Sequence, residues 1–218
     1  TKKGRAGSVK LEYNGNYGFQ YPHGLPKSAD AASSMMIINE DNMDNDKGGT
    51  ARWSQDQINE YLSGKKKSTD WYHAIMRNGA PQTQHTLSVS GGDNKIQFYA
   101  SAGYQYQESF LRSNDNNYEK FNVRSNISAK ISNRLKVELN LSGIMENNHK
   151  NYFGTDWIIR CMQRAPAFYP IFANNNPNYL GFEPVDTNPY AMTHSDISGY
   201  KLYKTKWLQS SSGVEYDI

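Results

Sequence analysis

The sequence predicts an all-β fold, a partial transmembrane antiparallel β-barrel of about six strands with long outer loops that contain short helices. Apolar residues recur at every second position in six segments, which is the period of a strand with one apolar face. Short and long links between these segments alternate. Aromatic residues make up 13% of a chain that is only 37% hydrophobic, and 16 of its 218 residues are Tyr.

The composition excludes several other classes of protein. Mean hydropathy is −0.83 and no run of 18 apolar residues exists, so no transmembrane helix is expected. The single Cys161 excludes an internal disulfide framework. A dispersed net charge of +3 does not indicate a nucleic-acid partner. Because the chain begins with Thr1 rather than Met, we expect an internal fragment or a processed form.

Alternation predicts the six strands, and their lengths favour a membrane. The strands are expected at residues 9–21, 85–90, 96–106, 121–131, 135–145 and 208–218. Strands of soluble proteins average about 5–6 residues. A tilted strand needs about 9–11 residues to cross the hydrocarbon of a bilayer. Four or five of the six predicted strands keep their phase for at least ten residues.

The links between the strands are of two kinds. Residues 91–94 (GGDN) and 132–134 (SNR) have the composition of tight turns, whereas residues 22–81, 108–117 and 146–203 form long links. Outer-membrane barrels alternate short periplasmic turns with long outer loops in this way. An aromatic girdle is expected where the strands meet the long links. Its members are Tyr17, Phe19, Tyr21, Tyr104, Tyr106, Tyr118 and Phe121.

The phase of the alternation assigns the two faces of the sheet. A shift of one residue would turn Arg124 toward the centre of the bilayer, at a cost of about 2–4 kcal/mol. Arg124 and Lys130 are therefore predicted to face the lumen. The residues predicted to face lipid are Phe98, Tyr104, Tyr106, Ile127 and Leu139.

The long links are expected to contain helices. Residues 50–64 carry Trp53, Ile58, Tyr61 and Leu62 at helical spacing and end at a glycine. Residues 69–79 begin at Thr69 or Asp70 as the N-cap and end at a glycine. Residues 155–166 repeat this design and end before a proline.

The third long link contains the best candidate for ligand contact. Aromatic rings can stack on sugars or grip peptides, and asparagine amides can hydrogen-bond to either. The same rings can instead pack into a small core of the link itself, which we weigh highest, or contact a partner. The candidate residues are Tyr152, Phe153, Trp157, Phe168 and Tyr169.

The remaining groups of acidic, His and nucleophilic residues do not indicate catalysis or an EF-hand. The acidic segment at residues 39–49 (NEDNMDNDKGG) fails the spacing of an EF-hand, so a solvated loop is expected, with an irregular calcium site as the alternative. The five His residues lack metal-ligand spacing, and no catalytic order of nucleophile and base is present. We therefore expect neither an enzyme nor a cofactor.

Four stretches of the sequence form a distinctive pattern when their order and spacing are taken together. They are TKKGRAGSVKLEYNGNYGFQ, STDWYHAIMRNGAPQTQHTLSVSGG, YASAGYQYQESFLRSNDNNYEKFNVRSNISAKISNRLKVELNLSG and NPYAM at residues 188–192. In this order they resemble the SusC/RagA family of TonB-linked outer-membrane receptors, over nearly the whole chain. Tyr72 and His73 replace the usual acidic pair after Asp-Trp, and Ser109 replaces a turn glycine, which bears on loop detail.

This resemblance implies a domain organisation. Residues 1–8 would be the end of a plug domain, and residues 9–218 the N-terminal portion of a barrel of twenty-two strands. Six strands alone would leave two edges with unpaired backbone groups in hydrocarbon, at several kcal/mol per group. We therefore expect this chain to be a piece of a longer receptor, whose remaining barrel completes the sheet.

The resemblance also implies a function in the outer membrane of Gram-negative bacteria. Receptors of this kind import an oligosaccharide or oligopeptide with a SusD-like surface lipoprotein, and TonB acts through parts outside this chain. The partners would therefore be that lipoprotein, TonB, membrane lipid and the nutrient. The alternative is a secreted soluble β-sandwich that binds glycans or mediates adhesion, with its apolar face against a protein core.

Overall fold

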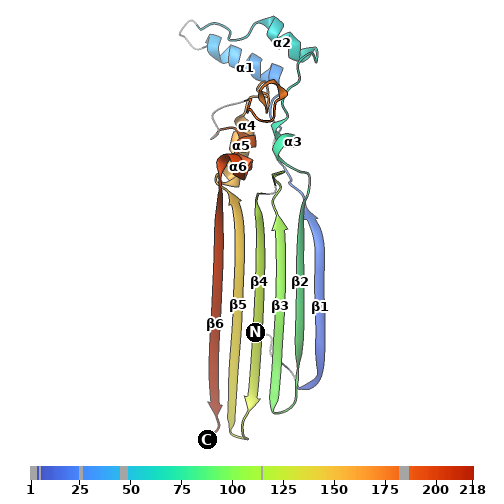
Figure 1. Cartoon of the computed structure of the whole chain (residues 1–218), viewed down its shortest axis with the longest axis vertical. Helices are drawn as coiled ribbons and strands as arrows, with labels where there is room; N and C mark the ends of the chain where they lie inside the picture. The colour runs from blue at the N-terminus through green and yellow to red at the C-terminus, as the bar shows by residue number, and fades with distance from the viewer. Residues whose placement is uncertain (1–3, 5, 25–26, 45–48, 114, 182–186) are drawn as a thin grey trace.

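The computed structural model describes residues 4, 6–24, 27–44, 49–113, 115–181 and 187–218. Figure 1 shows a long sheet with a group of short helices above one end. Among the described residues, no helix is both long and apolar enough to cross a bilayer. The strands are β1 (Gly7–Gln20), β2 (Ala80–Gly92), β3 (Ile96–Glu108), β4 (Asn117–Lys130), β5 (Leu135–Asn151) and β6 (Tyr200–Tyr216).

The sheet is an open antiparallel meander. Its strand order is β1-β2-β3-β4-β5-β6, so each strand pairs with its neighbour in the sequence. Within the described part of the chain, β1 and β6 each pair on one side only. The prediction of six antiparallel strands is confirmed. The described strands form one sheet, so the second sheet of a β-sandwich is not among them.

Side chains at the two tight turns hold the hairpins. The Asp93 carboxylate accepts hydrogen bonds from the backbone N–H groups of Ile96 and Lys95, each 2.7 Å long. These bonds stabilise the charged form and hold the pKa of Asp93 below its usual range. Gly92, at φ +137°, is required because a Cβ there would lie 2.1 Å from the carbonyl oxygen of Ile96. In the second turn, Ser132 accepts from the N–H groups of Arg134 and Leu135.

The strands next to the long links extend further than alternation predicts. β2 begins at Ala80, β5 continues to Asn151 and β6 begins at Tyr200. The predicted links 22–81 and 146–203 are therefore wrong at their ends, and the structure has links at 21–79 and 152–199. Charged and amide side chains occupy these strand ends, and Lys150 pairs with Lys201. Backbone pairing does not require apolar side chains, so the ladder continues where the apolar period stops.

Register separates the residues predicted for the two faces. Phe98, Ile127 and Leu139 lie in one row across β3, β4 and β5, and their side chains share a face that we call the apolar face. Tyr104 and Tyr106 share this face by alternation. Arg124 and Lys130 lie on the opposite face, which we call the polar face.

At several central positions, the burial of these two faces is the reverse of that in a soluble sheet. On the apolar face of the sheet, 71% of Leu11 and 57% of Val123 are exposed. On the polar face, only 7% of Ser88 and 5% of Asn126 are exposed. Soluble proteins bury aliphatic side chains and leave such polar groups in water. Other large side chains of the apolar face are exposed too, such as Leu87 and Leu141.

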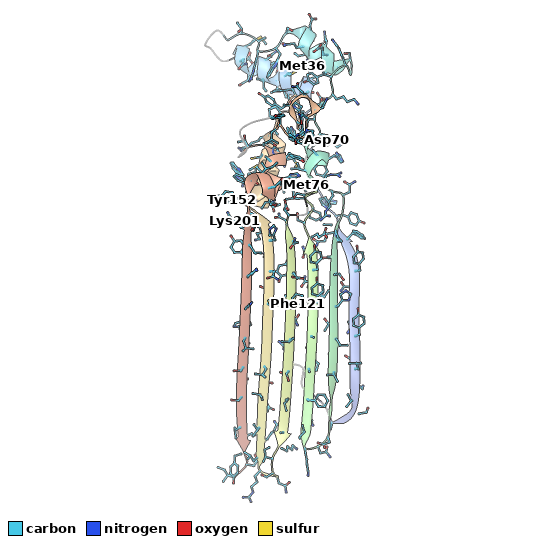
Figure 2. The ribbon with its side chains drawn as sticks, viewed as in Figure 1. Met36, Asp70, Met76, Phe121, Tyr152 and Lys201 are labelled. Carbon is cyan, nitrogen blue, oxygen red and sulfur yellow. The ribbon has the colours of Figure 1, made fainter. Side chains whose placement is uncertain are left out.

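The aromatic residues of the predicted girdle lie toward the helical end of the sheet, but they do not all share one face. Tyr17 is level with Tyr106, and Tyr104 is level with Phe121, all toward the helical end of the sheet. Figure 2 labels Phe121 in the upper part of β4. Tyr118 differs, because alternation along β4 turns it to the polar face, where its hydroxyl donates to Glu146 at 2.8 Å.

The helices form within the predicted ranges but end earlier. α2 (Gln55–Leu62) begins with a capping box between Ser54 and Gln57, and α3 (Trp71–Ile75) begins at the N-cap Asp70. α3 stops before Gly79 because Met76 forms a β-bridge with Leu111. α4 (Thr155–Arg164) has Gly154 as its N-cap, so the prediction that it repeats the Thr/Asp cap is wrong.

Further helices occur where none was expected. α1 (Ala31–Asp44) includes the first six residues of the acidic segment, so the expectation of a loop is wrong there, and residues 45–48 lie outside the described residues. The third link adds a 3-10 turn (Ala173–Asn175), α5 (Pro189–Thr193) and α6 (Ser195–Ser198). The described residues contain no group of three His, Cys, Asp or Glu placed to hold a metal.

Candidate functional site

The described parts of the three long links fold together above the sheet, and we call this unit the cap. Figure 1 shows α3, α4, α5 and α6 gathered just above the strand ends, with α1 and α2 beyond them. The first, second and third links all contribute to one buried apolar cluster, so none of them is an independent loop. The cluster comprises Trp71, Ile75, Met76, Leu111, Ile158, Cys161, Met162, Ala165 and Met192.

A short stretch of pairing attaches the first link to the end of β3. Next to the bridge between Met76 and Leu111, the N–H of Arg77 donates to the carbonyl of Phe110 at 2.8 Å. The Arg77 guanidinium also donates to the carbonyl of Ser109 and forms a 2.6 Å ion pair with Glu108. Because that ion pair is mostly shielded from water, it stabilises the junction more than a surface pair would. Figure 2 shows Met76 at this junction.

Buried amides attach the third link to the end of β5. The backbone N–H of Asn151 donates to the side-chain oxygen of Asn116, and the side-chain amide of Asn151 donates to the carbonyl of Thr193 at 2.6 Å. Asn188 caps α5 by accepting from the N–H groups of Tyr190 and Ala191. Buried polar groups need such partners, so these asparagines fix the path of the link.

A second, smaller cluster holds α1 against α2. Ala32, Met35 and Ile58 are buried there, with Phe168 of the third link packed against them. The ring of Phe168 lies 4.8 Å from that of Trp53, centroid to centroid. The buried side chain of Asn39 ties α1 to the segment just before α2, because it donates to the carbonyl of Trp53 and accepts from two backbone N–H groups.

The five candidate aromatic residues divide into two groups. Phe153 and Tyr169 pack on the large cluster and Phe168 on the small one, as the self-packing interpretation expects. Tyr152 and Trp157 instead keep 51% and 41% of their surface exposed. Sequence cannot separate them, because all five are aromatic residues of one link.

Tyr152 has a cationic neighbour at the base of the cap. The Lys201 ammonium lies 4.7 Å from the centroid of the Tyr152 ring, which is a cation–π contact. The ring of Phe153 meets Tyr152 edge-on at 5.2 Å. Figure 2 shows Tyr152 and Lys201 side by side where β6 meets the cap. These contacts hold the Tyr152 ring in place while leaving half of it open to a partner.

A cleft of about 700 Å³ lies between the chain entering α1 and the start of α3. Lys27, Asp30, Thr69, Asp70 and His73 contribute its polar lining. Burial alone would raise the pKa of Asp70, but hydrogen bonds from the backbone and ring of His73 outweigh it and lower that pKa. Sequence reasoning missed the cleft, because its walls are separated in the chain and Asp70 was recognised only as a helix cap.

Together these features define a class of structure. An open antiparallel sheet has large apolar side chains exposed on one face and polar side chains such as Asn126 buried on the other, with tight turns at one end and a folded cap at the other. This is the construction of a segment of barrel wall with its outer loops.

Comparison with known proteins agrees with this class. No family model matches the chain. The chain is 29% identical over 143 residues to TonB-dependent receptor P3 of Formosa agariphila, covering 66% of this chain. It is 26% identical over 126 residues to TonB-dependent receptor P26 of the same organism, covering 57% of this chain. The match spans 12% of the length of each of these relatives.

Solved structures of RagAB share the fold. The chain matches the RagAB peptide transporter with a TM-score of 0.59 and 22% identity, covering 81% of this chain and 22% of that one. It matches the "closed-closed" RagAB peptide importer with a TM-score of 0.52 and 25% identity, covering 68% and 19%. The predicted resemblance to SusC/RagA-type TonB-dependent receptors is thus confirmed, and the sheet matches part of such a barrel. These relatives are receptors and transporters rather than enzymes, as expected.

The shared cluster predicts that a change in one link loosens another. Ile158→Ala removes a fully buried side chain of α4 and should destabilise the cap by about 2–5 kcal/mol. In the full-length protein, hydrogen exchange should accelerate in α3 of the first link as well as in α4. The control is Ile197→Ala, at an exposed position of the same link. Unchanged exchange in α3 would contradict a shared core.

Proposed function

We propose that this chain forms part of the barrel wall and outer cap of a TonB-dependent importer in the outer membrane of Gram-negative bacteria. The importer would take up nutrient oligomers, peptide or glycan, as the transporter of a SusC/SusD-type complex. The observation that carries this proposal is the reversed burial of the two faces, with Leu11 and Val123 open and Asn126 enclosed.

Lipid is the environment that suits the apolar face. Each strand has 13 to 17 residues. At about 3.3 Å per residue, even the shortest exceeds the roughly 30 Å hydrocarbon core of a bilayer. Monomeric soluble proteins rarely expose a contiguous apolar patch beyond a few hundred Å². Phe98, Ile127 and Leu139 would contact acyl chains, while Arg124 and Lys130 would face the lumen.

The unpaired edges support a barrel larger than six strands. In hydrocarbon, backbone N–H and C=O groups without partners cost several kcal/mol each, so β1 and β6 need further strands beside them. The rest of the same receptor would supply those strands. Residues 1–8 would connect the barrel to a plug, through which TonB acts; β1 begins within this range, at Gly7.

The cap lies on the outer side in this proposal. The aromatic side chains near it, such as Tyr106 and Phe121, suit the boundary between hydrocarbon and headgroups. The exposed rings of Tyr152 and Trp157 and the polar cleft beside Asp70 would then face a SusD-like surface lipoprotein or the nutrient. Exposed aromatic rings suit both peptide and glycan ligands. The two RagAB structures are described as a peptide transporter and a peptide importer.

Placing a positive charge on each face of β5 in turn tests whether the apolar face contacts lipid. Leu141→Arg would put a cation into the bilayer, and it should destabilise the folded receptor by about 2–4 kcal/mol. Asn140→Arg, on the neighbouring polar face, should cost much less, because the lumen is wet and Glu138 lies two residues away on that face. The folded fraction in isolated outer membranes, scored by heat-dependent electrophoretic mobility, measures both variants. Equal losses for the two variants would contradict the proposal.

The exposed aromatics of the cap give a second test. Tyr152→Ala combined with Trp157→Ala should weaken binding of the surface lipoprotein or nutrient uptake by about tenfold, since exposed aromatic anchors often contribute more than 1 kcal/mol. Tyr21→Ala is the control, an exposed tyrosine just past β1. The receptor should still assemble in each variant. Unchanged uptake and unchanged lipoprotein affinity in the double variant would show that these two residues are not part of the contact surface.

A further inference from the structure

The apolar face contains a hollow near the middle of the sheet. It measures about 510 Å³ and is lined almost wholly by apolar atoms. Small residues of three adjacent strands form its floor, namely Ala100 and Ala102 of β3, Ser125 of β4 and Gly143 of β5. Larger side chains surround this floor. They include Leu11, Leu87, Val123, Leu141 and Leu208.

Register makes this hollow one continuous feature. Ala100 lies level with Ser125, and Ser125 lies level with Leu141. In the next row toward the cap, Ala102 pairs with Val123 and Val123 with Gly143. Ala100 and Ser125 stand side by side, and Ala102 and Gly143 lie in the next row on either side of Val123, so the space over these small residues belongs to one depression.

Two lysines stand on the apolar face above the hollow. Lys206 pairs with Met145, and Lys204 pairs with Asn147. Leu208, in the wall of the hollow, lies two residues below Lys206 on the same strand and face. A rise of about 3.4 Å per residue places these lysines roughly 7 and 14 Å further toward the cap. No ion pair involves either lysine among the described residues.

The only acidic side chain in the same rows is already engaged. Glu119 lies in the row of Lys204, two strands away. It accepts hydrogen bonds from the Tyr104 hydroxyl at 3.2 Å and from the Asn147 amide at 3.1 Å. Neighbouring strands are about 4.8 Å apart, so Glu119 is roughly 10 Å from the β6 backbone and does not neutralise both lysines.

The depth of the two lysines in the bilayer indicates which part of a lipid they contact. A lysine on the lipid face is costly at the centre of a bilayer but costs little near the interface. Lys204 and Lys206 share their rows with Tyr106, Tyr104 and Phe121, which are suited to that interface. Their ammonium groups would therefore lie among lipid headgroups, directly above an apolar depression.

We propose that β3 to β6 form a binding site for one anionic, phosphate-bearing lipid of the outer leaflet. An acyl chain fills the hollow over Ala100, Ala102 and Gly143, and Lys204 and Lys206 bind the headgroup phosphate. This inference rests on the proposed lipid exposure of the apolar face. It adds a specific ligand where a bare barrel wall would meet only exchanging lipids.

Native mass spectrometry of the full-length receptor tests the site. The receptor is purified in a mild non-ionic detergent and offered phosphatidylglycerol or phosphatidylcholine with the same acyl chains. The wild type should retain phosphatidylglycerol with a preference of roughly thirtyfold, the effect expected of two basic residues at a membrane surface. Lys204→Gln combined with Lys206→Gln should abolish this preference. Ala102→Leu, which fills the hollow, should lower retention of both lipids.

The control is Lys201→Gln, which alternation along β6 places on the polar face and which should keep the wild-type preference. An unchanged preference in the double lysine variant, or unchanged retention in Ala102→Leu, would overturn the site. So would a second protein copy occupying the face in place of lipid. If the receptor folds in the membrane and retains no lipid, the site fails while the proposed function stands. If the wild type does not insert into membranes, both fail.

Discussion

The whole structure depends on a sheet whose backbone is paired across six strands while its apolar side chains remain uncovered. In water, such a face would attract a second sheet, a helix or another copy of the chain. Here polar side chains such as Ser88 and Asn126 are buried while large apolar side chains are exposed. In the proposed function, a surrounding solvent of hydrocarbon makes this arrangement favourable. Hydrocarbon would in turn require backbone groups within it to be paired, and strands of 13 to 17 residues are long enough to cross it.

The cap follows from the same arrangement. Tight turns such as that at Asp93 end one side of the sheet, so all the long links meet at the other. There they pack their apolar residues against one another, with Ile158 of the third link beside Trp71 of the first and Leu111 of the second. A shared core fixes the outer surface to the rim of the sheet. The exposed Tyr152 is thereby held beside Lys201 at the top of β6.

Sequence predicted the parts of the fold that depend on local pattern. Strand identity, phase and the turns follow from period two and from turn residues, and these predictions hold. The upper ends of β5 and β6 were missed, because Asn147, Lys204 and Lys206 occupy the apolar phase there although their backbones pair. α1 was missed because only a few small or flexible side chains, such as Ala32 and Met35, are buried on it. The shared core depends on contacts between distant segments, which one sequence does not reveal.

The most direct measurement is the accessibility of spin labels along β4 in the full-length receptor embedded in a bilayer. With Cys161 replaced by Ala, single cysteines at positions from Phe121 to Lys130 carry a nitroxide, whose collisions with oxygen and with a water-soluble nickel complex are compared. Oxygen concentrates in lipid, so we expect it to collide more often with labels at the positions of Phe121, Val123 and Ile127 than with labels at the intervening positions. Collisions that do not alternate with a period of two, or that favour the positions of Asn122 and Arg124, would contradict the account.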